Sequence, residues 1–149
     1  MTTTPLTFAA WVAALSGRGH AVLAASHAVP VQLWLRTPDG SVLHFLARGT
    51  RVTLRRYAGS DLTSLVLRAE CDCEEHRTAG AGSRTVLTPG AVPAAEVVFD
   101  GAAELGWSGI EAGRIDVPTA AAMFDEMLAQ LAPVPVAEPV LPGRTRASA

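Results

Sequence analysis

Two cysteines and a histidine lie within six residues of one another, and thiolates and imidazoles are ligands that zinc favours. They are Cys71, Cys73 and His76. Structural zinc sites usually take paired cysteines from C-x-x-C turns, whereas these two are separated by a single residue on a predicted strand. Both cysteines could instead continue an apolar strand face, since free cysteine is among the most buried residue types. A small metal-binding protein or enzyme around these three residues is therefore one alternative for function, although no cofactor is expected.

Arginines gather on neighbouring predicted strands, in a pattern that a nucleic acid could use. The candidate contact residues are Arg48, Arg51, Arg55, Arg56 and Tyr57. Guanidinium groups pair with phosphates and an aromatic ring stacks with bases, so such a face would bind single strands with a steep dependence on salt. The same arginines could instead be solvated, or paired with acids inside the fold. Nucleic-acid binding is thus another alternative for function.

The charges are divided unevenly along the chain. Up to residue 68 there are seven arginines and two acids, whereas from residue 70 onward there are five arginines and twelve acids. The acidic second part could therefore neutralise the basic first part. An isoelectric point near 6.0 and an aromatic content of 5% also weigh against a protein dedicated to nucleic acid.

Catalytic motifs are not found in the sequence, which contains no G-x-S-x-G, H-E-x-x-H or phosphate-binding loop. No catalytic residue is therefore assigned. The preferred interpretation is a non-enzymatic binding or adaptor module, whose partner is another protein or a second copy of the chain, with a homodimer expected. Interfaces favour large apolar anchors, and the same side chains also suit a core. The candidate anchors are Phe124, Met127 and Trp34.

Alternating apolar and polar residues predict strands through the middle of the chain. The clearest signal is the turn sequence Thr37-Pro38-Asp39-Gly40 between two apolar runs, which predicts a β-hairpin. Residues 31–73 are expected to form a four-stranded antiparallel meander, with return strands after it. The predicted strands cover residues 31–36, 41–46, 51–57, 62–73, 84–87 and 96–99.

Helix signals lie on both sides of these strands. Thr4 followed by Pro5 predicts a helix over residues 5–16, and Asp116 before an apolar stripe predicts another over 118–131. Residues 20–28 are small and apolar and fit either strand or helix. The expected fold is α+β: an antiparallel β-meander of about four to six strands, with an N-terminal and a C-terminal helix packed on it.

The length and composition are typical of one folded domain. Of 149 residues, 49% are hydrophobic and 17% are charged. We expect a single domain over residues 1–132 and a proline-rich, disordered tail over 133–149. No apolar run approaches the roughly 20 residues that cross a bilayer, and the first residues lack the basic region of a secretory signal. A cytoplasmic protein without a membrane partner is expected.

Overall fold

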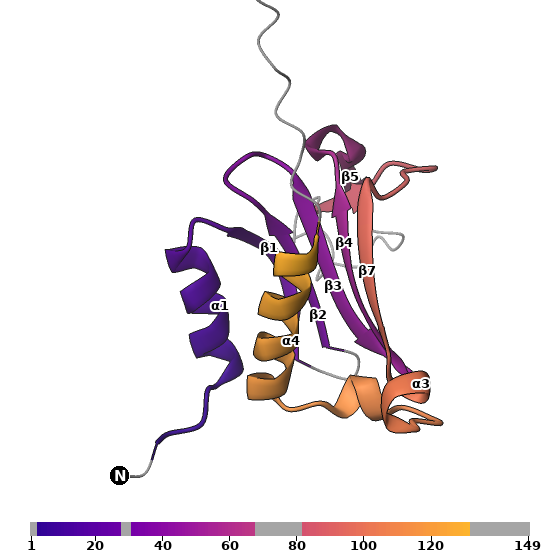
Figure 1. Ribbon diagram of the computed structural model, residues 1–149. Helices are drawn as coiled ribbons and strands as arrows, with labels where there is room; N and C mark the ends of the chain where they lie inside the picture. Colours follow the sequence, from indigo (N-terminus) through magenta and orange to yellow (C-terminus); the bar gives the residue numbers. More distant parts are fainter. Residues whose placement is uncertain (1–2, 28–30, 68–81, 132–149) are drawn as a thin grey trace, which may run out of the picture.

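The computed structural model describes residues 3–27, 31–67 and 82–131, and their side chains except for residues 64–67 and 82–84. It contains a five-stranded antiparallel sheet with the strand order β1-β2-β3-β4-β7 (Figure 1). Two further strands form a separate antiparallel pair. The sheet strands are β1 (Ala21–Ser26), β2 (Val31–Arg36), β3 (Val42–Arg48), β4 (Arg51–Tyr57) and β7 (Ala95–Asp100), and the pair is β5 (Leu62–Leu67) with β6 (Gly82–Leu87).

Two longer helices lie on the same face of the five-stranded sheet (Figure 1). This arrangement confirms the expected α+β fold, with an antiparallel sheet and helices from both ends of the described chain. The predicted tail, residues 133–149, lies outside the described residues. The helices are α1 (Phe8–Gly17), α4 (Val117–Gln130) and the short α3 (Gly101–Leu105), and two single 3₁₀ turns are η1 (Gly59–Asp61) and η2 (Glu111–Arg114).

Three aromatic rings join the helices to the sheet. Trp11 of α1, Phe45 of β3 and Phe124 of α4 meet edge to face, with ring centroids 5.7–6.0 Å apart. Phe45 and Phe124 have no exposed surface. Burial of a side chain of this size contributes about 1.5–3 kcal/mol, so this cluster fixes both helices on one face.

The two helix starts differ in how well the sequence locates them. Asp116 caps α4 as expected, because its carboxylate accepts a hydrogen bond of 2.8 Å from the Thr119 amide. α1 begins three residues later than predicted, with Thr7 rather than Thr4 as its cap. The Thr7 hydroxyl accepts a hydrogen bond of 3.2 Å from the Ala10 amide, and Phe8, Trp11 and Leu15 lie on the helical face toward the core.

The fourth strand of the predicted meander is not part of the main sheet. β5 pairs with β6, and β4 pairs with β7 instead, so that Val97 and Phe99 of β7 extend the apolar side of the sheet. Residues 20–28, whose sequence fits either strand or helix, contain β1 at the opposite edge of the sheet. The sheet therefore takes three strands from the predicted meander and one from each side of it.

Candidate binding face and sheet edge

The sheet face away from the helices, which we call the outer face, carries a row of side chains that crosses all five strands. The register pairs each residue directly with the next. Directly opposed residues of antiparallel strands have Cβ atoms about 4.5–5.5 Å apart, so these side chains are immediate neighbours. We call this the cross-sheet row, and its members are Ala24, Trp34, His44, Arg55 and Glu96.

Trp34 and His44 form a stack at the centre of the row. Their ring centroids are 3.8 Å apart and their planes differ by 9°. Burial, and secondarily the positive charge of Arg55, lower the pKa of His44 to about 4. The imidazole is therefore neutral near pH 7, so its Nε2 can accept a hydrogen bond of 3.0 Å from the Gln32 amide nitrogen.

The arginines of the outer face are partly neutralised by β7. Arg55 forms an ion pair with Glu96, which raises the pKa of Arg55 chiefly through their hydrogen bond. Arg51 lies 3.6 Å from a carboxylate oxygen of Asp100. Both acids come from the second part of the chain, as the interpretation of paired arginines expects. These two contacts reduce the positive charge that a phosphate backbone would meet.

Of the other three candidate nucleic-acid contacts, two do not share an exposed surface with this pair, whereas Arg48 lies directly opposite Arg51. Arg48 is exposed at the end of β3 on the outer face. Tyr57 shares that face but only 5% of it is exposed, and its ring centroid lies 6.2 Å from that of Trp34. Arg56 lies in register with Leu43, on the helix side of the sheet. The structure thus divides the predicted set between two faces.

The three candidate partner anchors have different environments. Phe124 has no exposed surface and Met127 is 3% exposed, because both lie on the side of α4 that packs against the sheet. Trp34 is half-buried on the outer face. Of the three, it is the side chain that offers surface to a partner in this conformation.

The candidate zinc ligands Cys71, Cys73 and His76 lie outside the described residues. Among the residues that the structure does describe, no three His, Cys, Asp or Glu side chains are grouped closely enough to hold a metal ion. The metal site at these positions therefore stays a prediction.

Strand β1 forms an exposed edge that the sequence did not identify. It pairs with β2 on one side, and all its residues except Val22 are exposed. The exposed fraction of Leu23 is 40%, and the strand contains no charged residue. The opposite edge strand β7 carries Glu96 and Asp100. Natural edge strands commonly use charge to prevent pairing, and β1 lacks this protection.

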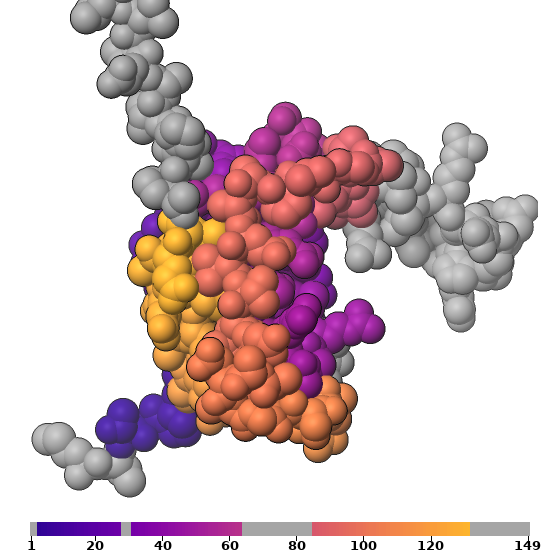
Figure 2. All heavy atoms as spheres, turned by 45° about the vertical axis from the view of Figure 1, so that its right-hand side comes forward, coloured from indigo at the N-terminus to yellow at the C-terminus, as the bar shows by residue number. Residues whose placement is uncertain are grey.

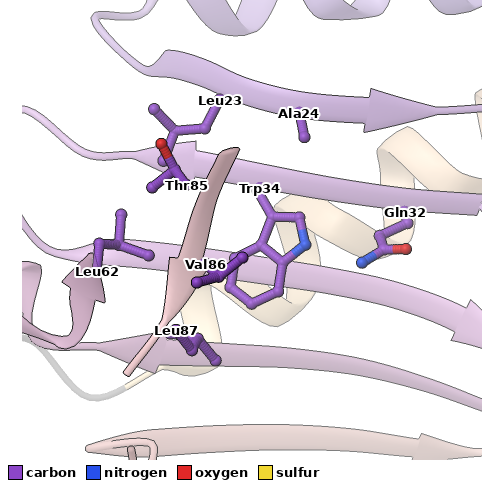
Figure 3. Close-up of a pocket in the computed structure, with 8 residues that line it drawn as sticks. All are labelled: Leu23, Ala24, Gln32, Trp34, Leu62, Thr85, Val86 and Leu87. Atoms are coloured by element: carbon purple, nitrogen blue, oxygen red, sulfur yellow. The ribbon is translucent and has the colours of Figure 1, made fainter. Parts of the chain in front are cut away.

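A groove of about 430 Å³ lies between this edge and the β5–β6 pair. Figure 3 shows β6 crossing over the outer face, with the indole of Trp34 between its side chains and those of β1. Six of the eight residues that line the groove are apolar. The lining consists of Leu23, Ala24, Gln32, Trp34, Leu62, Thr85, Val86 and Leu87.

A second, smaller cavity of about 230 Å³ lies between β7 and α4. Figure 2 views the molecule from this side and shows the segments from β7 to α3 running along the surface beside α4. Its walls include Phe99 and Trp107, whose rings meet edge to face 5.8 Å apart, and Met123 of α4. These side chains also pack against the core, so this cavity is a gap in packing next to the helix.

Comparisons with known proteins do not place the chain in a family. No protein-family model, curated protein or solved structure matches it. In the part of the chain that the structure describes, none of the helices has the length and apolar character needed to cross a membrane. Function must therefore be inferred from the edge strand and the outer face.

Proposed function

We propose that the protein is a non-enzymatic binding module that associates with a second copy of itself through strand β1. The exposed, uncharged edge formed by residues 21–26 carries this proposal. An edge strand has backbone N–H and C=O groups on its free side, and an added strand satisfies them. Antiparallel pairing of two β1 strands about a two-fold axis would join the two five-stranded sheets into one.

The charge distribution favours a second copy as the partner. A two-fold axis brings the same strand of both copies together. A charged strand therefore lies against the same charges of the second copy. β1 contains only alanine, valine, leucine and serine, and two copies can approach without repulsion. Pairing of two β7 strands would instead bring Glu96 and Asp100 near the same acids of the second copy. β1 is therefore the edge suited to self-association.

The side chains of β1 also gain from pairing. Leu23 is 40% exposed, and its neighbours in the strand, Val22 and Ala24, are apolar. Burying apolar surface contributes roughly 25 cal/mol for each Å² removed from water. A register shift between Val22 and Ala24 marks a β-bulge in this strand, which increases the local twist. The paired region is thus expected to centre on the residues after the bulge.

The experiment compares one charge placed on each edge. Ala25→Lys introduces a lysine at an exposed position of β1 that does not line the groove. Val98→Lys introduces the same charge on β7, where Val98 is 45% exposed. We expect light scattering behind size exclusion to give a dimer for the wild type and for Val98→Lys, and a monomer for Ala25→Lys.

Charge complementation makes the test specific. An equimolar mixture of Ala25→Lys and Ala25→Glu should recover the dimer, because opposite charges then meet across the two-fold axis. A monomeric wild type would overturn the proposal, as would a dimer that Ala25→Lys leaves intact. Binding of β1 to another protein's strand would appear as a monomeric wild type that still protects the β1 amides when that protein is present.

A further inference from the structure

The cross-sheet row has an open position at Ala24. Trp34 lies between two row neighbours, His44 on β3 and Ala24 on β1. One face of the indole is covered by the His44 ring. The other neighbour, Ala24, has only a methyl side chain, so the space beside the second face of the indole is unfilled. The groove of about 430 Å³ lies at this point, since both Ala24 and Trp34 line it.

The walls around this position define which ligands fit. Leu62, Val86 and Leu87 lie on the side formed by the β5–β6 pair, and Leu23 lies on the β1 side (Figure 3). The described side chains that line the groove include no charged group. A charged ligand would therefore lose its hydration without gaining a counter-charge, which disfavours it.

We propose that this position binds a flat, uncharged aromatic ring, which stacks on the free face of Trp34 and continues the row formed with His44. The volume lies within the about 300–1,000 Å³ range of ligand pockets. Offset or edge-to-face packing between aromatic rings stabilises a pair beyond its buried area. An aliphatic group of the same size fills the space but does not gain this additional stabilisation.

Gln32 borders this position with its side-chain amide. The amide nitrogen donates to the neutral His44 ring, which orients the side chain. Figure 3 shows this nitrogen on the side toward Trp34 and the carbonyl oxygen on the far side. The ligand is therefore defined by its flat, uncharged ring, as in indole. The ring can belong to a free small molecule or to a tryptophan side chain, and both present this chemistry.

The test is a titration of the full-length, ¹⁵N-labelled protein with indole, followed by NMR. We expect saturable shifts of the Trp34 indole N–H and the Gln32 amide, with smaller shifts at Trp11 and Trp107. Indole-3-acetate and cyclohexanol should bind at least about ten-fold more weakly, because one is charged and the other lacks a flat ring. N-acetyltryptophanamide, which resembles a tryptophan within a peptide, distinguishes the two sources of the ring. An affinity equal to that of indole assigns the site to a tryptophan side chain, and absence of binding assigns it to a free small molecule.

Two variants locate the site. Ala24→Leu fills the open position and should weaken indole binding at least about ten-fold. Ala21→Leu places the same side chain at an exposed β1 position that does not line the groove, and should bind as the wild type does. Unchanged α4 amide shifts in both variants will show that the fold is kept. Non-saturable binding, or equal affinity in Ala24→Leu, would overturn the proposal. The proposal rests on the groove of one chain, and the titration can be made whether or not β1 pairs with a second copy.

Discussion

Protonation of His44 should destabilise the protein as the pH falls. The side chain is 7% exposed, stacks on Trp34 and accepts a hydrogen bond from Gln32. Its pKa is about 4, against an ordinary value of 6.5, mainly because burial disfavours the charged ring. The unfolded chain therefore takes up this proton at a higher pH than the native state does.

The sign and size of the pH effect on the free energy of unfolding follow from this difference in the pKa of His44. Between pH 6.5 and about 4 the unfolded state binds more protons, so the free energy of unfolding decreases as the pH falls through this window. Above pH 6.5 both states are neutral and the contribution is constant. A pKa lowered from 6.5 to about 4 corresponds to about 3 kcal/mol when the pH has passed both values. Part of the ring still reaches solvent, so we expect a loss of about 2 kcal/mol by about pH 4.5.

Urea unfolding of the wild type and of His44→Phe, at about pH 7.5 and about pH 4.5, measures this loss. Phenylalanine keeps a ring against Trp34 but cannot titrate. The variant should lack about 2 kcal/mol of the decline seen in the wild type. His20, whose pKa is also lowered, titrates alike in both proteins and cancels in the comparison. Equal declines would refute the assignment of this pH dependence to His44.

Two further predictions concern the core and the outer face. Phe124→Ala should lower the free energy of unfolding by about 3–5 kcal/mol, because it leaves a cavity beside Trp11 and Phe45. As a control in the same urea measurement, Leu105→Ala at an exposed position should change it by less than about 0.5 kcal/mol. We expect no retention on single-stranded DNA at low salt, because Arg51 and Arg55 are paired with acids. Retention that is lost in the double variant Arg51→Ala/Arg55→Ala would establish the nucleic-acid alternative instead.

Local signals explain why much of the fold could be predicted from the sequence. The turn between β2 and β3 is encoded within five residues: the Asp39 carboxylate accepts hydrogen bonds from the Ser41 amide and hydroxyl, and Gly40 adopts a positive φ of 86°. These bonds, together with one from the Thr37 hydroxyl, lower the pKa of Asp39 to about 2. Once this turn is placed, the opposition of Trp34 and His44 follows by counting back along both strands.

The elements that could not be predicted depend on contacts between distant residues. β7 lies about forty residues after β4 in the chain, so neither the pairing of Arg55 with Glu96 nor the departure of β5 is visible in local patterns. Gly59 permits a close approach where the chain leaves β4, because a side chain there would collide with the carbonyl of Gly40. At β1, a bulge interrupts the alternation by which a strand could be recognised.

The two proposals, self-association through β1 and ring binding beside Ala24, concern neighbouring residues but different surfaces of the strand. Ala25→Lys adds a charge on the helix side of β1, where Ala25 lies in register with Leu33, whereas Ala24→Leu changes the groove above the outer face. If β1 pairs with a second copy, that copy's strand lies next to Ala24, where the cross-sheet row ends. Ring binding measured in the Ala25→Lys monomer therefore decides how the site is built. Equal affinity in monomer and dimer means that one chain forms the whole site, and a loss in the monomer means that the second copy supplies one of its walls.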